Sequence, residues 1–202
     1  MTVRIMIAED QTMVRQALVA LLELEPDLDV VAQAASGDEA LAMARRHEPD
    51  VAILDIEMPG PSGIEVASQL TASGFRGGIV IVTTFDRPGY LRTAMAAGAR
   101  GFLLKDAPAA DLAAAIRRVS VGERVVDPAL AAAALAQGDS PLTDREGEVL
   151  AAAASHDAIA DVAARLHLSP GTVRNHLSAA IQKLGARNRA EAAQIAQQKG
   201  WL

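Results

Sequence analysis

The chain has 202 residues, of which 50% are hydrophobic and only 2% aromatic, so its cores must be built from Ala, Leu, Val and Ile. It contains no cysteine, which excludes a disulfide framework and a Cys-ligated zinc site. The net charge is −6, but the first 120 residues contain 11 Lys/Arg and 16 Asp/Glu, whereas residues 141–202 contain 7 and 6. Only the C-terminal part is therefore suited to approach a phosphate backbone.

The sequence shows neither a targeting segment nor a membrane span. No charged-then-apolar leader opens the chain, and no apolar run approaches the roughly 18 residues that a spanning helix requires. We therefore expect a soluble, cytoplasmic protein.

The first 120 residues alternate between short apolar runs and stretches with helical periodicity. The apolar runs predict strands at Val3–Ile7, Val30–Ala34, Val51–Leu54, Ile79–Val82 and Gly101–Leu104. The periodic stretches predict helices at about Val14–Leu24, after Ser36, and at Ile64–Leu70, Pro88–Ala97 and Ala109–Val121. This alternation is typical of an α/β domain with a five-stranded, parallel, doubly wound (flavodoxin-like) sheet.

Polar residues follow four of these strands. Glu9 and Asp10 follow the first strand, Asp55 the third, Thr83 the fourth and Lys105 the fifth. Each residue alone is more often a turn acid, a strand residue or a solvated charge. Because the carboxyl ends of parallel strands meet at one edge, we expect all of them to converge there.

The chemistry of such a cluster favours phosphoryl transfer. Carboxylates held close together repel one another unless a cation joins them, and hard oxygen ligands suit Mg²⁺. A carboxylate such as Asp55 could then act as nucleophile toward a phosphoryl donor. Lys105 and the Thr83 hydroxyl could hold the transferred oxygens.

The character of the sequence changes after residue 121. A partly mobile linker with a short helix is predicted there. It contains Gly122, Asp127-Pro128, an alanine-rich segment and a polar stretch that ends at Ser140. We therefore place domain boundaries at 1–121, 122–140 and 141–202.

The last domain is predicted to be all-α, with four helices. Thr143 and Glu146 form a capping-box pattern at the start of the first helix, which runs to about Ser155. The other helices are expected at Ile159–Leu166, Pro170–Leu184 and Arg189–Lys199. A tight turn between the second and third predicts a helix-turn-helix, although the pattern alone also allows a small dimerisation module.

The third of these helices has an apolar stripe at Val173, Leu177 and Ile181, which must face the core. The residues on its other faces are candidates for contact with DNA. We expect base contacts from Arg174, Asn175 and Ser178, and phosphate contacts from Thr172, His176 and Lys183.

Residues 1–120 resemble the receiver domain of two-component response regulators. The matching residues are Glu9-Asp10, D-x-x-M-P-G at 55–60, Thr83 and G-F-L-L-K at 101–105. The resemblance implies that Asp55 accepts a phosphoryl group from a sensor histidine kinase, and that Thr83 and Phe102 are switch residues. It also implies a Mg²⁺ site formed by Glu9, Asp10, Asp55 and the backbone carbonyl of Glu57.

Residues 141–202 resemble the LuxR-type DNA-binding domain. The matching segments are L-T-D-R-E-G-E-V-L (142–150), V-A-A-R-L-H-L-S (162–169), T-V-R-N-H-L (172–177) and K-L-G-A-R-N-R (183–189). Together the two domains resemble the NarL/FixJ class of regulators. His156 and Asp161 depart from the usual family residues, which predicts a slightly altered turn and cap.

A closer resemblance is to the DesR-like subgroup, which is paired with membrane-fluidity-sensing kinases and controls fatty-acid desaturase expression. It rests on A-E-D-Q (8–11), T-T-F-D-R-P-G-Y (83–90), G-T-V-R-N (171–175) and K-G-W (199–201). Relatives in this subgroup dimerise through the first and fifth receiver helices. The resemblance therefore implies an interface containing Leu18, Leu22, Leu112 and Ile116, although each could instead be core.

The sequence thus predicts a transcription factor in which phosphorylation promotes dimerisation and sequence-specific DNA binding. Its expected partners are a sensor histidine kinase, double-stranded DNA and a second copy of the chain, and RNA polymerase is a further candidate. No enzymatic activity is expected beyond Mg²⁺-dependent self-phosphorylation. Two alternatives are a Mg²⁺-dependent phosphotransferase or phosphatase, and a regulator that keeps the fold without being phosphorylated.

Overall fold

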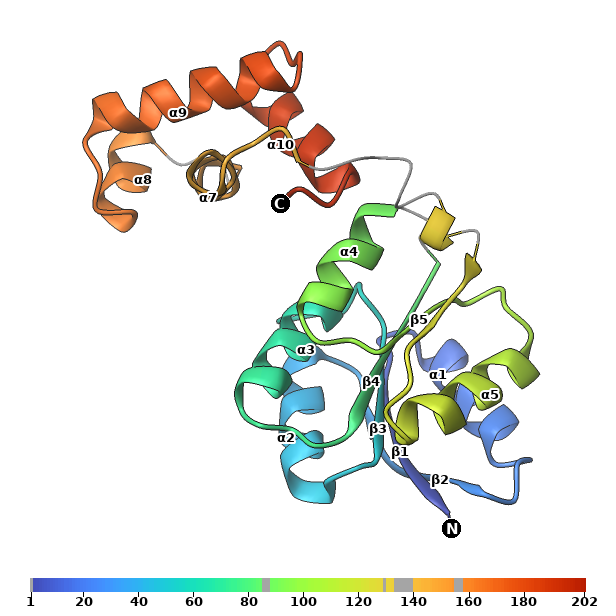
Figure 1. Cartoon of the computed structure of the whole chain (residues 1–202). Helices are drawn as coiled ribbons and strands as arrows, with labels where there is room; N and C mark the ends of the chain where they lie inside the picture. The colour runs from blue at the N-terminus through green and yellow to red at the C-terminus, as the bar shows by residue number, and fades with distance from the viewer. Residues whose placement is uncertain (1, 85–87, 129, 133–139, 155–157) are drawn as a thin grey trace. The chain divides into compact units, whose positions relative to one another are not determined.

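The computed structural model describes residues 2–84, 88–128, 130–132, 140–154 and 158–202 (Figure 1). The chain forms two compact units, a larger one built on a sheet and a smaller helical one that contains the C-terminal residues. Within the described residues, no helix combines the length and apolar character that crossing a bilayer would require.

The larger unit contains a parallel sheet in the order β2-β1-β3-β4-β5-β6. The doubly wound α/β fold predicted from the sequence is confirmed, but the sheet has six strands instead of five. The additional β6 is only two residues long, too short to give a hydrophobic pattern, and lies in the segment predicted to be linker. The strands are β1 (Val3–Ala8), β2 (Leu28–Ala34), β3 (Val51–Leu54), β4 (Gly78–Thr83), β5 (Gly101–Leu104) and β6 (Val125–Val126).

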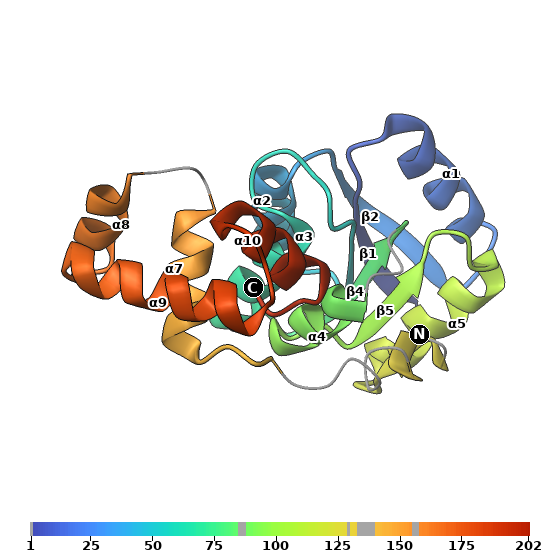
Figure 2. The same cartoon turned by 90° about the horizontal axis from the view of Figure 1, so that it is seen from above.

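Helices cover both faces of this sheet, as Figures 1 and 2 show. Helices α1 (Thr12–Leu22) and α5 (Ala109–Ser120) pack on one face, and α2 (Gly37–His47) and α3 (Gly63–Ala72) on the other. Helix α4 (Pro88–Ala96) connects β4 to β5. The central strands are buried on both faces, which explains their continuous apolar sequences.

Two helix starts in this unit are fixed by side-chain caps. The Ser36 hydroxyl accepts a hydrogen bond from the Glu39 amide, as the sequence predicted for α2. Ser62 and Glu65 form a reciprocal capping box at α3. These caps set where each helix leaves the carboxyl edge of the sheet.

The smaller unit consists, in its described part, of α7 (Asp144–Ala153), α8 (Ile159–Arg165), α9 (Pro170–Lys183) and α10 (Arg189–Gln198). Figure 2 shows α7 and α10 beside the long α9, with α8 at its amino end. The predicted capping box of Thr143 and Glu146 is present. The chain turns from α8 to α9 at His167, whose φ of 54° is left-handed. The core includes Val149, Leu150, Val162, Val173 and Leu177.

Gly63 provides a stability test of this packing, because a Cβ at this position would lie 1.9 Å from the carbonyl oxygen of Asp55. We expect Gly63→Ala to lower the free energy of unfolding of the larger unit by about 1–3 kcal/mol. Chemical denaturation measures this change. Ser68→Ala, on the exposed side of the same helix, should change it by no more than about 0.5 kcal/mol. Equal effects of the two substitutions would contradict the close packing.

Candidate functional site

The structure brings three carboxylates together at the carboxyl edge of the sheet. Glu9 and Asp10 follow β1, and Asp55 follows β3 beside it; one carboxylate oxygen of each lies within 4.8 Å of the others. Glu9 and Asp55 are only 1% and 5% exposed, whereas Asp10 is open to solvent. The convergence expected from the strand ends is therefore present.

Lys105, at the end of β5, supplies the cationic partner of this cluster. Its Nζ lies 2.6 Å from Glu9 Oε2 and 3.1 Å from Asp55 Oδ2. The Lys105 amide donates to the carbonyl of Thr83, which fixes the two strand ends next to each other. One ammonium group thus neutralises part of the charge of two buried acids.

The Asp55 carboxylate is held by backbone contacts as well as by Lys105. Its Oδ1 accepts a hydrogen bond from the Ile56 amide at 2.9 Å, and the Asp55 amide donates to the carbonyl of Ala8. Burial raises the pKa of Asp55 above its usual value, and the Glu9 charge adds to this rise, while Lys105 opposes both. Asp55 is consequently a fixed carboxylate in a partly desolvated site.

The loop after Asp55 is fixed by contacts with two helix starts. The Gly37 amide, at the start of α2, donates to the carbonyl of Pro59 at 3.0 Å, and the Gly63 amide donates to Ile56. Gly60 has a φ of 76°, in the left-handed region that favours glycine. These contacts place the Met-Pro-Gly sequence beside the acids. The Glu57 side chain is exposed.

The two predicted switch residues lie on neighbouring strands. Thr83 is the last residue of β4, and Phe102 pairs with Ile81 inside β5; both side chains are 0% exposed. Phe102 is therefore a buried residue of the strand that Lys105 directly follows.

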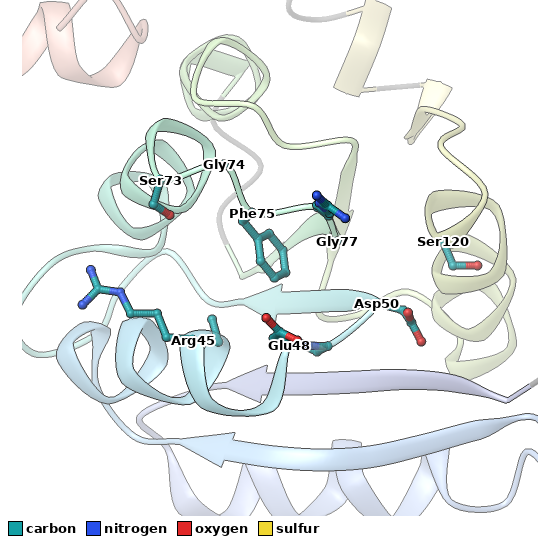
Figure 3. A pocket seen from close by; sticks show the side chains of 11 residues that line it. Arg45, Glu48, Asp50, Ser73, Gly74, Phe75, Gly77 and Ser120 are labelled. Atoms are coloured by element: carbon teal, nitrogen blue, oxygen red, sulfur yellow. The ribbon is translucent and has the colours of Figure 1, made fainter.

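A cavity lies at the edge of the sheet opposite the acidic cluster (Figure 3). This cavity of about 670 Å³ opens near the amino ends of β3 and β4 and contains charges of both signs from Arg45, Glu48 and Asp50. The Asp50 carboxylate already accepts a hydrogen bond from the Arg4 amide. None of the acidic-cluster residues lines this cavity, so it is not part of the site.

Helix α9 presents the side chains predicted to contact DNA. Val173 and Leu177 are buried in the core, whereas Arg174, Asn175 and Ser178 are exposed on the other side of the helix. The three residues predicted to contact phosphates are less exposed or already have partners within the domain. Thr172 and His176 are half-buried, the Thr172 hydroxyl is hydrogen-bonded to Ser169, and Lys183 forms an ion pair with Glu146.

Comparison with known proteins decides the family. The sequence profile of the response regulator receiver domain matches residues 5–117, and that of the LuxR family of bacterial regulatory proteins matches residues 140–196. The chain belongs to the NarL/FixJ-class response regulators. It is therefore a phosphorylation-regulated transcription factor.

Individual relatives match this regulator over its whole length. The transcriptional regulatory protein YvfU of Bacillus subtilis is 50% identical over 99% of this chain and 100% of its own. The transcriptional regulatory protein DesR of the same organism is 44% identical over 99% of both chains, which agrees with the DesR-like resemblance of the sequence. The crystal structure of the response regulator ChrA is 33% identical, with a TM-score of 0.60 over 100% of this chain and 99% of its own.

The receiver places most of the predicted dimer residues inside the protomer. Leu22, Leu112 and Ile116 are at most 6% exposed and belong to the core under α1 and α5. Helical periodicity identified the stripe that faces the sheet, so these side chains cannot also meet a partner in this fold. Only Leu18 is partly exposed.

Several contacts of the regulator were not predicted from the sequence. The Arg15 guanidinium donates to the backbone carbonyl of Glu9, and Arg117 on α5 forms ion pairs with Glu25 and Asp27 before β2. The Arg117 guanidinium lowers the pKa of Asp27 to about 2. These partners are distant in sequence and have no local pattern. Of the two family departures, Asp161 lies in the first turn of α8, and His156 lies outside the described residues.

The raised pKa of Asp55 gives a prediction about stability. Because the folded pKa lies above the unfolded value, the native state keeps this proton to higher pH, and stability from this group is lost as the pH rises through the folded pKa. Asp55→Asn should therefore unfold at higher denaturant concentration than wild type at neutral pH, because the amide carries no charge that burial would desolvate.

This advantage of Asp55→Asn should shrink as the pH falls through the folded pKa of Asp55, because the wild-type carboxyl is then neutral as well. Urea titrations at several pH values measure it. Asp111→Asn, an exposed acid on α5, serves as the control and should show little difference. A variant no more stable than wild type at neutral pH would show that Lys105 fully compensates the burial of Asp55.

Proposed function

We propose that Asp55 is the phosphoacceptor and that a sensor histidine kinase is its physiological donor. The observation that supports this most strongly is the buried cluster in which Lys105 contacts both Glu9 and Asp55 at the carboxyl edge of the sheet. The membership of the chain in the response regulators supports the same assignment.

The cluster also suits a divalent cation. The Glu9 Oε2 atom is buried and, apart from its ion pair with Lys105, has no hydrogen-bond partner of normal geometry, so a hard oxygen ligand is available. We propose that Glu9, Asp10, Asp55 and the backbone carbonyl of Glu57 hold Mg²⁺. When bound, Mg²⁺ neutralises negative charge on the carboxylates and on the phosphoryl group.

The reaction requires little rearrangement of the chain. An Asp55 oxygen forms a bond to phosphorus while the phosphorus–nitrogen bond of the donor histidine breaks, and the imidazole leaves with a proton. The Ile56 amide orients the carboxylate. Lys105 and the Thr83 hydroxyl would receive the transferred oxygens, and Phe102, on the strand that precedes Lys105, would respond as a switch residue.

The DNA-binding role is assigned to α9. Its exposed Arg174, Asn175 and Ser178 suit base edges in the major groove, while its apolar stripe anchors it in the domain core. With 7 basic and 6 acidic side chains in residues 141–202, one domain can neutralise few phosphates. Two copies on adjacent half-sites would gain affinity through effective concentration.

We therefore propose that phosphorylation favours a receiver dimer, and that its surface is the outer face of α1 and α5. Leu21 and Leu24, at the end of α1 and just beyond it, are 45% and 78% exposed, and Val121 at the end of α5 is 75% exposed. The ion pairs of Arg117 join these two regions. These exposed residues replace Leu22, Leu112 and Ile116 as candidates, and Leu18 is retained.

The acceptor assignment is tested by labelling. The full-length protein incubated with Mg²⁺ and acetyl phosphate should gain one phosphoryl group, measured as intact mass, and removal of Mg²⁺ with a chelator should prevent this. Asp55→Ala should abolish the gain because, among the described residues, the cluster of carboxylates with Lys105 occurs at Asp55, whereas Asp111→Ala should retain it. Undiminished incorporation in Asp55→Ala would exclude Asp55 as the acceptor.

The dimer proposal is tested by sedimentation. Beryllofluoride with Mg²⁺, which stands in for the phosphoryl group, should shift the full-length protein from monomer to dimer. Leu24→Asp should prevent the shift by placing a charge in the apolar contact, and Gln69→Asp on the exposed face of α3 should not. An unchanged monomer–dimer equilibrium together with stronger DNA binding would show that phosphorylation releases the DNA-binding domain instead.

A further inference from the structure

One carboxylate in the DNA-binding domain accepts hydrogen bonds at the start of α7 and at the end of α9. Glu146, in the first turn of α7, is 7% exposed. Its Oε2 accepts hydrogen bonds from the Thr143 amide at 2.8 Å and from Lys183 Nζ at 2.6 Å. The first contact completes the cap of α7, and the second holds the last residue of α9.

The residue before Glu146 holds the other end of the helix-turn-helix. Arg145 Nη2 donates to the carbonyl of Leu166 at 3.1 Å, at the end of α8 just before the turn into α9. Two consecutive residues of α7 therefore contact the segment that precedes α9 and the residue that ends it. Figure 2 shows α7 lying against α9, as this arrangement requires.

We propose that Arg145 and Glu146 position α9 for base recognition, and that Lys183 is a positioning residue rather than a phosphate contact. The inference rests on the proposed role of α9 in DNA binding. Arg174 lies nine residues before Lys183, about 14 Å along the helix at 1.5 Å per residue. A small rotation or tilt of α9 at the Lys183 end therefore changes where Arg174, Asn175 and Ser178 point.

The cost of breaking the ion pair favours this role. If Lys183 turned to a DNA phosphate, the buried Glu146 would lose its cationic partner. The hydrogen bond from Lys183 is also the main reason that the pKa of Glu146 lies below its usual value, with the Thr143 amide second. Glu146 is thus charged at neutral pH, and its charge is matched by Lys183.

The experiment compares two DNA duplexes with the full-length protein in Mg²⁺ and beryllofluoride. The first duplex carries the sequence that wild-type protein enriches from a randomised pool. The second carries the same bases in scrambled order. The ratio of the two affinities measures base recognition. The dependence of each affinity on salt concentration counts phosphate contacts. If wild type enriches no sequence, the proposed DNA-binding function fails, and the positioning hypothesis fails with it.

Lys183→Met and Glu146→Gln should each lower the affinity ratio by about tenfold, comparable to the loss of a base contact in Arg174→Ala. Affinity for the scrambled duplex and the salt slope should stay at the wild-type values. The double variant should be no worse than the worse single variant, because both remove the same contact. Lys183→Arg keeps the pairing and should restore most of the ratio.

The opposite pattern would overturn the proposal. A phosphate contact at Lys183 predicts weaker binding of both duplexes in Lys183→Met, a salt slope reduced by about one, and no loss of ratio in Glu146→Gln. Glu191→Gln, which disrupts the ion pair between Glu191 of α10 and the exposed Arg187 before it, is the matched control and should behave as wild type. If Glu146→Gln does not fold, Lys183→Met and Lys183→Arg, at an exposed position, decide between the two outcomes.

Discussion

The ammonium group of Lys105 between two buried carboxylates is the interaction on which the receiver depends. Glu9 and Asp55 come from neighbouring strands and are almost inaccessible to water, so without a cation their repulsion would oppose the pairing of β1 and β3. Lys105 reaches both acids from β5, across β4. Lys105 thus joins the end of β5 to the acids that follow β1 and β3.

The receiver was largely predictable because its signals are local. Continuous apolar runs indicated strands buried on both faces, and the rule that parallel strands share a carboxyl edge brought together acids separated by 45 residues. The number of strands was wrong by one, since β6 has only two residues and its pairing with β5 depends on where the chain returns after α5. Local sequence does not contain that information.

Periodicity also shows which face of a helix is apolar without showing what covers it. Leu22, Leu112 and Ile116 lie on the stripe that was predicted, but the sheet of the same protomer covers them. The contact between Glu146 and Lys183 was missed for a related reason. The sequence explains Glu146 completely as half of a capping box, and a second partner 37 residues away leaves no trace in the local pattern.

The short strand β6 has a consequence for the edge of the sheet. Without it, β5 would be the edge of the sheet, with unpaired backbone groups beside the apolar residues Gly101 to Leu104. Val125 and Val126 pair with Gly101 and Phe102 and so cover the first half of that edge, and the Val125 amide donates to the Arg100 carbonyl. A receiver fragment ending at Val121 would therefore leave the backbone groups of Gly101 and Phe102 unpaired at a sheet edge, whereas one extended past β6 would keep them paired.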